Sequence, residues 1–429
     1  MRGCARASWG DPMTDVPSTD ALAGPEARRH PAMDPAAASR PETEAERRAR
    51  EAYFTASQGQ LIWARFRRQR AAMVAGAVLV FMVLTGFFAP FLSPYDPTIA
   101  GRNPDYMNGA PQIPMFCDDN GCSLRPFLHT PVRERSMATN FRWVTRMDTE
   151  QRRYVQFFVQ GSEYRYFAFD LDLPGKALDV RFRGIPFTTH LFGVDQGMIH
   201  LFGTDAQGKD IFSRTLHAVW TSLAVGTIGV VIAFVLALII GGVSGYYGGW
   251  IDGALQMLTD AIRTVPAIPL FMAIAAFIPD TWSAEARFFF ISCVLGFINW
   301  PTLARRVRTH LLTERSAEYV LAAQLCGASS GHVIRRHLLP SFTSYIIVDL
   351  VISFPYMVLS ETALSFIGLG LKDPVNSLGV MLQNVTKADV LLNYQWYFIP
   401  VIFFIALVMA FVFVGDGLRD AADPYSDKK

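Results

Sequence analysis

One segment of this sequence has the glycine and lysine spacing of a phosphate-binding loop. Residues 203–210 read Gly-Thr-Asp-Ala-Gln-Gly-Lys-Asp, and the first seven satisfy the pattern G-x-x-x-x-G-K. Such a loop needs serine or threonine at the eighth position to hold magnesium, whereas Asp210 places a carboxylate there. No strand-like run precedes the segment and no nucleotide-binding helix pattern follows it. We therefore expect no nucleotide site here.

Two cysteines are spaced for redox chemistry. Cys117 and Cys122 close the run Cys-Asp-Asp-Asn-Gly-Cys, which could form a small disulfide ring in an oxidising compartment. A zinc site would need more cysteine or histidine ligands at useful spacing, and only His129 is nearby. A disulfide is the better hypothesis.

Charged side chains inside apolar runs are the remaining candidates for chemistry. Asp349 and Glu361 lie in the run 342–366, and a buried intramembrane acid is a functional hypothesis by default. Both lie nearer the ends of the run than its middle, so interfacial anchoring explains them equally well. Asp260 and Arg263 are three residues apart and can pair on one helical face. No nucleophile and base pair stands out, which argues against an enzyme.

The elements that must position these residues are long apolar runs. The chain has 429 residues, of which 51% are hydrophobic and only 18% charged. A bilayer span needs about 20 apolar residues. The strongest runs are 71–92, 218–242, 342–366 and 396–414, and the weaker ones are 255–279 and 288–303. The sequence predicts an all-α polytopic membrane protein with six transmembrane helices, the third broken or kinked at Pro266 and Pro269.

Arginines gather on one side of this predicted membrane. One group precedes the first span and the other follows the fourth, so six spans place both on the same side. The positive-inside rule makes that side cytoplasmic, together with both termini. These arginines are juxtamembrane and are not interleaved with exposed aromatics, which argues against nucleic-acid binding. The groups are Arg47, Arg48, Arg50, Arg65, Arg67, Arg68 and Arg70, then Arg305, Arg306, Arg308, Arg315, Arg335 and Arg336.

The N-terminal part divides by composition. Residues 1–43 have the composition of a disordered cytoplasmic tail. Residues 44–70 read as an amphipathic helix in the membrane interface, or as a plain extension of the first transmembrane helix at 71–94. Residues 95–202 form too long a segment to lack structure, and we expect a small β-rich periplasmic subdomain.

Within that subdomain, one local pattern predicts a β-hairpin. Tyr154–Phe158 and Tyr164–Asp170 are aromatic and β-branched runs, and Gln160-Gly-Ser-Glu separates them as a turn. Further along, small residues recur at Gly241, Gly245 and Gly249, and this stripe indicates close helix packing in lipid.

The segment between the fourth and fifth spans is polar and helical. Gly327 interrupts a helix-forming run and readily takes positive φ, so we expect one helix to end there and a second to start at another angle. Pro340 is then expected to close the second helix. This shape suits insertion into a groove on a partner, although a solvated connector has the same pattern.

Four motifs carry a resemblance to a known family. Ala322-Ala323, Gly327 and His337-Leu-Leu-Pro340 resemble the coupling loop of ABC importer permeases, with Leu321 where the family often has glutamate. His337 favours the dipeptide and oligopeptide branch. The stretches 203–214, 361–370 and 415–424 are similar to the C-type subunit of that branch.

The resemblance implies a fold and a set of contacts. The fold is the ABC importer permease type: six transmembrane helices with a small β-rich periplasmic insertion, in the bacterial inner membrane. Residues 203–424 form the core, with five of the transmembrane helices and the cytoplasmic coupling loop 304–340, and 425–429 are a cytoplasmic tail. The residues implied to contact the ATPase are Ala322, Ala323, Gly327, His337, Leu339 and Pro340.

The resemblance also implies a function, which is that of a permease subunit in an ATP-driven importer of peptides or peptide-like solutes. The chain itself would need no cofactor, because partner subunits bind ATP. The implied partners are a second homologous permease, two ATPase subunits, a periplasmic solute-binding protein and membrane lipid. A secondary transporter would show inverted repeats and midplane ionisable groups, and a membrane enzyme would need catalytic side chains at one interface. We regard both alternatives as weaker.

Overall fold

The structure is a computed structural model of the chain. It describes residues 58–98, 106–118, 121–135, 143–172, 179–195, 197–279, 282–341 and 343–422. The predicted tails 1–43 and 425–429 lie outside the described residues, as does the first part of the predicted interfacial helix 44–70. The described part of that helix is α2 (Gln58–Phe66), which contains Trp63 and the buried Phe66.

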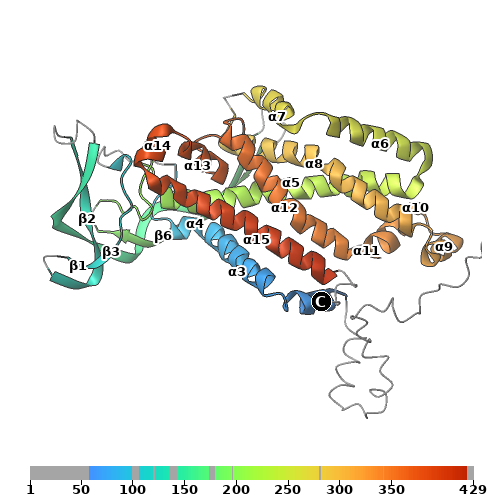
Figure 1. Cartoon of the computed structure of the whole chain (residues 1–429), viewed down its shortest axis with the longest axis horizontal. Coiled ribbons are helices and arrows are strands. Elements are labelled where there is room, and N and C mark those ends of the chain that lie inside the picture. Colours follow the sequence, from blue (N-terminus) through green and yellow to red (C-terminus); the bar gives the residue numbers. More distant parts are fainter. Residues whose placement is uncertain are drawn as a thin grey trace, which may run out of the picture. The chain divides into compact units, whose positions relative to one another are not determined.

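A bundle of long helices forms most of the structure (Figure 1). In the described part of the chain, 5 helices are long and apolar enough to cross a membrane, or up to 6 if one bent pair counts as a single span. The predicted helical membrane fold is therefore confirmed. The helices are α3 (Arg70–Phe87), α5 (Ile211–Tyr247), α8 (Ala284–Glu314), α12 (Thr343–Phe366) and α15 (Ile399–Ala422).

The bent pair consists of α6 (Gly249–Thr264) and α7 (Ala267–Ala276), whose axes differ by 80°. Val265 between them has ψ 123°, an extended conformation. A proline disfavours the helical conformation in the residue before it, so Pro266 explains the break. The expected interruption at Pro266 is therefore confirmed.

The first span is shorter than the predicted helix 71–94. α3 ends at Phe87, and a separate short helix, α4 (Ala89–Leu92), follows Phe88. Pro90 lies in the first turn of α4. Backbone N–H groups in a first turn have no acceptor within the helix, so a proline there removes no hydrogen bond. Within a continuous helix the same proline would remove a hydrogen bond, so the chain breaks here.

The contact between α5 and α8 is extensive and close. A Cβ atom on Gly245 would lie 2.7 Å from the carbonyl oxygen of Arg308, and one on Gly241 would overlap the carbonyl of Ala304. Small residues therefore allow these two backbones to touch, as the glycine stripe predicts. Gly249 does not share this role, because nothing lies within 4 Å of its Cβ position.

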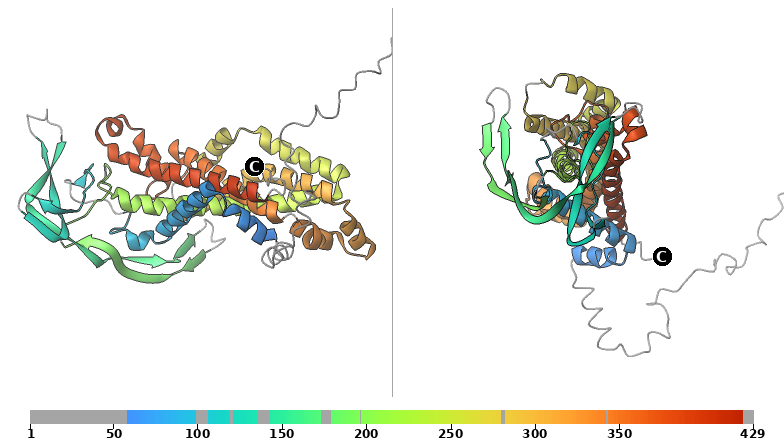
Figure 2. Two further views of the ribbon diagram at one scale, coloured as in Figure 1. Left: turned by 60° about the horizontal axis from the view of Figure 1, so that its bottom comes forward. Right: turned by 90° about the vertical axis from the view of Figure 1, so that its left-hand side faces the viewer.

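The insertion between α4 and α5 contains an antiparallel sheet with the order β1-β2-β3-β6 (Figure 2). Its small core is formed by Leu128, Val155 and Ile199. A two-stranded ladder, β4 with β5, follows the far end of β3. The strands are β1 (Met115–Asp118), β2 (Gly121–Arg135), β3 (Trp143–Tyr166), β4 (Phe169–Asp172), β5 (Asp179–Phe182) and β6 (Ile185–Val194).

The predicted hairpin within 154–170 is wrong. β3 runs without a turn to Tyr166, and its partner is β6, with Val155 opposite Val194 and Tyr164 opposite Phe187. Gln160-Gly-Ser-Glu produces only a shift of register between Gln160 and Tyr164. Pairing with a strand distant in sequence therefore outweighs the local turn signal, and the polar residues form an irregularity in one long strand.

Candidate functional site

The segment between α8 and α12 contains short helices around one glycine turn. α9 (Glu318–Leu325) ends at Gly327, whose φ is 84°. The N–H of Gly327 donates to the carbonyl of Gln324 at 2.9 Å, and that of Ala328 donates to Ala323 at 3.1 Å. These two bonds across a left-handed residue form a Schellman motif. Gly327 therefore ends α9 by the mechanism that the sequence predicts.

The second half of the segment differs from the prediction. α10 (Ser330–Val333), the π-turn η5 (Ile334–Leu338) and α11 (Leu339–Ser341) follow one another, and Pro340 lies inside α11. Pro340 therefore does not close the helix. Proline cannot donate to the carbonyl four residues earlier, and the N–H of Leu339 instead reaches Ile334 across a π-turn.

The start of the predicted loop 304–340 also needs correction, because α8 continues to Glu314. Val307 and Leu311 are one helical turn apart and are buried. They hold the end of α8 against the rest of the bundle, so residues 304–314 belong to a packed helix. The helical segment that remains is 315–341.

This segment is anchored to the bundle by a small core of its own. Val320 from α9, Val333 from α10 and Leu338 from η5 are fully buried against Val307 and Leu311 of α8. Since α9, α10 and η5 each contribute one buried side chain, the segment packs against the end of α8.

The side of the segment that faces away from α8 exposes apolar side chains of α9. Leu325 is 90% exposed and Leu321 is 48% exposed, and Arg335 and Arg336 of η5 are also exposed. Tyr319 donates to a carboxylate oxygen of Glu314 at 2.9 Å, and burial of part of its ring raises its pKa. Of the residues implied by the resemblance, Ala322, Gly327 and Pro340 are exposed, whereas Ala323, His337 and Leu339 are half-buried.

Arginines of α8 pair with acids on neighbouring helices. Arg305 pairs with Asp260 of α6, and Arg306 pairs with Asp349 of α12. The expected pairing of Asp260 with Arg263 is wrong, because the packing of α6 on α8 brings Arg305 to this carboxylate. Pairing across helices reduces the cost of charges at this depth.

A polar groove lies between α8 and α12. It has a volume of about 370 Å³, and its lining combines polar side chains with three apolar ones: Asn299, Thr302, Arg306, Ser353, Tyr356 and Ser360, with Leu303, Ile352 and Met357. A second cavity of about 690 Å³ shares Thr302 and Arg306 with it and includes Asp349, the partner of Arg306. Polar side chains on facing membrane helices generally line the interior of an assembly or a water-filled path.

Comparison with known proteins identifies the family. Residues 229–426 match the family model of the binding-protein-dependent transport system inner membrane component. The Mycobacterium tuberculosis oligopeptide transport system permease protein OppC is 33% identical over 231 residues, which are 54% of this chain and 77% of that protein. The chain belongs to this permease family. It is a multi-pass inner-membrane transport subunit, and the family implies ATPase and binding-protein partners.

Further comparisons agree with this assignment. Residues 57–111 match the N-terminal TM domain of oligopeptide transport permease C. The Bacillus subtilis dipeptide transport system permease protein DppC is 36% identical over 226 residues, covering 52% of this chain and 68% of that protein. A solved structure, the inward-facing MetNI methionine ABC transporter, is 20% identical with a TM-score of 0.37, covering 48% of this chain and 95% of that chain.

The phosphate-loop pattern of the permease has a structural role. Asp210 caps α5, because its carboxylate accepts from the N–H of Ser213 at 2.7 Å and lies 3.1 Å from Nδ1 of His200. The ammonium of Lys209 donates to both carboxylate oxygens of Asp373, at 2.8 and 2.7 Å. Lys209, which fits the nucleotide pattern, therefore joins the start of α5 to the segment after α12, and Asp210, which breaks the pattern, caps α5.

Two sets of buried polar contacts in the permease are not predictable from the sequence. Arg214 pairs with Asp205 and donates to the amide oxygen of Asn376 at 2.7 Å. Glu361 is 0% exposed and accepts from the hydroxyl of Ser365 at 2.8 Å. Interfacial anchoring of Glu361 is therefore wrong. The residue types were visible in the sequence, but no local pattern brings α5 to residues 361–376.

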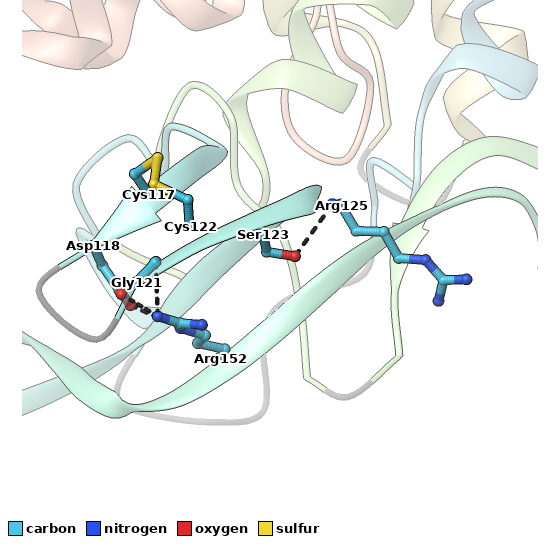
Figure 3. The surroundings of a disulfide bond; sticks show 7 residues. All are labelled: Cys117, Asp118, Gly121, Cys122, Ser123, Arg125 and Arg152. Atoms are coloured by element: carbon cyan, nitrogen blue, oxygen red, sulfur yellow. Dashed lines mark hydrogen bonds and ion pairs between the residues drawn. A yellow bond between two sulfur atoms is a disulfide. The ribbon is translucent and has the colours of Figure 1, made fainter.

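The cysteine pair lies at one end of the sheet (Figure 3). Cys117 of β1 and Cys122 of β2 are opposite each other, with Cα atoms 4.0 Å apart, and the structure joins them by a disulfide. Nε of Arg152 donates to Asp118 at 2.9 Å, and its Nη2 donates to the carbonyl of Gly121 at 3.0 Å. In the described part of the chain no group of His, Cys, Asp and Glu side chains could hold a metal ion.

Proposed function

We propose that this permease carries peptides or peptide-like solutes as one transmembrane subunit of an ATP-driven importer. The proposal is supported by relatives whose names describe oligopeptide and dipeptide transport and whose sequences match the helical core. A second homologous permease would complete the pore, and two ATPase subunits would supply the energy.

Coupling to the ATPase is assigned to the segment 315–341. The observation that carries this assignment is a segment packed on α8 that exposes apolar side chains. Val320 and Leu338 attach it to α8, while Leu321 and Leu325 of α9 are exposed before the turn at Gly327. Exposed leucines on a segment that also exposes Arg335 and Arg336 suit a groove on a protein partner. A movement of the ATPase would then reach α8 directly.

The solute path is assigned to the polar groove between α8 and α12. Asn299, Thr302, Ser353 and Ser360 supply uncharged hydrogen-bonding groups beside apolar side chains and the guanidinium of Arg306, a lining that suits a peptide with both polar and apolar surface. The second permease would supply the opposite wall of the path.

The orientation in the membrane is part of the proposal. The arginine-rich segments support a topology with 315–341 and both termini in the cytoplasm and the β-rich insertion in the periplasm. The insertion then lies on the side of the solute-binding protein.

Copurification with the ATPase subunits tests the coupling assignment. Leu325→Asp puts a charge on the exposed surface of α9, and we expect at least a ten-fold loss of bound ATPase at an unchanged membrane level. Leu392→Asp in α14 (Ala388–Asn393) is the matched control, because this leucine is 79% exposed but outside the segment. Equal ATPase binding by both variants would contradict the assignment.

A further inference from the structure

An apolar groove separates the first span from the β-rich insertion. It has a volume of about 720 Å³, within the range of about 300–1,000 Å³ typical of ligand sites. One wall comes from α3 and α4, with Phe81, Leu84 and Phe88, and the other from β3 and β6, with Tyr164 and Phe187. None of the described residues that line it is charged.

Aromatic contacts fix the two walls relative to each other. The ring of Phe87 stacks on Tyr166 with centroids 5.5 Å apart and meets Trp220 of α5 edge-on at 5.7 Å. Phe91 contacts Phe158 at 6.4 Å, and α4 contacts β6. Figure 2 shows the β3–β6 ribbon continuing beside the helices. The groove is therefore built between elements that hold each other in place.

The helical wall is continuous with the lipid-facing surface of the permease. Phe81, Leu84 and Phe88 are 61%, 50% and 43% exposed, and the first two belong to the candidate span α3. Side chains exposed on a membrane helix contact acyl chains unless protein covers them. Since the same side chains line the groove, the groove opens toward lipid.

The β-rich insertion also exposes apolar side chains outside the groove. Phe158, Phe167 and Phe182 are 67%, 66% and 61% exposed, and Ile185 is 55% exposed. A sheet surrounded by water seldom presents such a patch, whereas aromatic residues are common at the membrane interface. The end of the ribbon therefore has the surface of a segment that lies in the interface beside α3.

We propose that this groove binds an acyl chain of a membrane phospholipid from the leaflet next to the β-rich insertion. An acyl chain needs apolar area and no fixed polar partner, which matches an uncharged aromatic lining. A peptide would bring backbone N–H and C=O groups that such a lining leaves without partners. The bound chain fills the space between α3 and the ribbon and so holds the insertion against the first span.

Photolabelling tests this site in the complete transporter. The complex is reconstituted with phosphatidylethanolamine that carries a diazirine on one acyl chain, irradiated, digested and mapped by mass spectrometry. We expect adducts on both walls, at residues 81–92 of the helical wall and at residues 164–166 and 187–189 of the strand wall. Labelling of the helical wall alone, or crosslinks from this groove to the second permease, would overturn the proposal.

Two groove-filling variants make the test specific. Thr189→Trp narrows the groove from the strand wall and Thr85→Trp from the helical wall, and each should lower labelling of the groove peptides at least three-fold. Ile405→Trp on α15 is the control, because this residue is 54% exposed on a candidate span outside the groove. If either well-folded variant labels like the control, the groove does not hold the chain. Solute transport is not the readout, so failure here leaves the proposed function untouched.

Discussion

The guanidinium of Arg214 donates to the carboxylate of Asp205, and both side chains are nearly inaccessible to solvent, at 2% and 9% exposure. Arg214 belongs to the first turn of α5, and its Nε donates to Asn376, just before α13 (Leu378–Val385). The hydrogen bond from Arg214 to Asn376 therefore joins the start of one membrane helix to a segment 162 positions later in the chain.

Replacing this arginine should destabilise the permease strongly. Arg214→Met keeps most of the side-chain volume but leaves Asp205 buried without its partner, which costs about 3–5 kcal/mol. We expect a clearly lower unfolding temperature in detergent. Arg165→Met is the control, because its pair with Glu163 is 45% and 51% exposed and should contribute under about 1 kcal/mol. Equal shifts for both variants would show that burial of the Arg214 pair does not matter.

A second prediction concerns the contact between α5 and α8. Gly241→Ala would place a methyl group against the carbonyl of Ala304, so the two helices must separate. Overpacking of this kind costs about 1–3 kcal/mol. Gly242→Ala, one position later, meets nothing within 4 Å and should be neutral. Thermal unfolding of the purified variants measures the difference, and two equal unfolding temperatures would argue against a close-packed contact.

The sequence predicted features that depend on local chemistry. The spans follow from apolar length, the break between α6 and α7 follows from Pro266, and the end of α9 follows from the freedom of Gly327 to take positive φ. Each depends on residues a few positions apart, so a single sequence contains the information.

Features that depend on distant partners could not be predicted. The hairpin expected near Gln160 fails because β6 supplies the pairing edge, and Asp260 pairs with Arg305 because of how α6 packs on α8. The apolar groove beside α3 also arises only when a strand ribbon reaches that helix. In each case the partner is fixed by the tertiary fold, which no local pattern encodes.

The disulfide gives a third prediction. Cys117 and Cys122 should be oxidised in the mature protein, and mass mapping under non-reducing conditions should find the linked peptide. Loop-closure arithmetic for so small a ring gives a stabilisation of about 2 kcal/mol. Cys117→Ser should therefore loosen β1 while the pairing of β2 with β3 remains. Detection of both cysteines as free thiols would show that the disulfide does not form.

Orientation gives a fourth prediction, for which the chain supplies its own probe. Cys326 is exposed at the end of α9, whereas Cys293 is half-buried in α8. In a Cys4→Ala background, a membrane-impermeant maleimide should label Cys326 in inverted vesicles and leave it unlabelled in intact cells. Cys326→Ser should abolish the signal. Labelling in intact cells would place the segment 315–341 outside and reverse the proposed topology.

The fifth prediction separates a coupling segment from a simple connector. Gly327 has φ 84° and no atom within 4 Å of its Cβ position. Gly327→Val is therefore penalised by backbone conformation and not by crowding, at about 1 kcal/mol or more. The Schellman bonds should weaken and the exposed Leu325 should lose its fixed position, since it lies two residues before the turn. We expect weaker ATPase copurification and less stimulation of ATP hydrolysis by loaded binding protein, at an unchanged membrane level.

Gly331→Val is the matched control for this change. Gly331 also has nothing within 4 Å of its Cβ position, but it lies inside α10 and is not among the positive-φ glycines of the described residues. Stimulation of ATP hydrolysis should therefore be nearly normal in Gly331→Val. In Gly327→Asn it should lie between the values for Gly331→Val and Gly327→Val, because asparagine tolerates left-handed backbone better than valine does. This order of the three variants follows only if the turn conformation carries the coupling. Normal ATPase stimulation in Gly327→Val would mean that the segment merely connects α8 to α12.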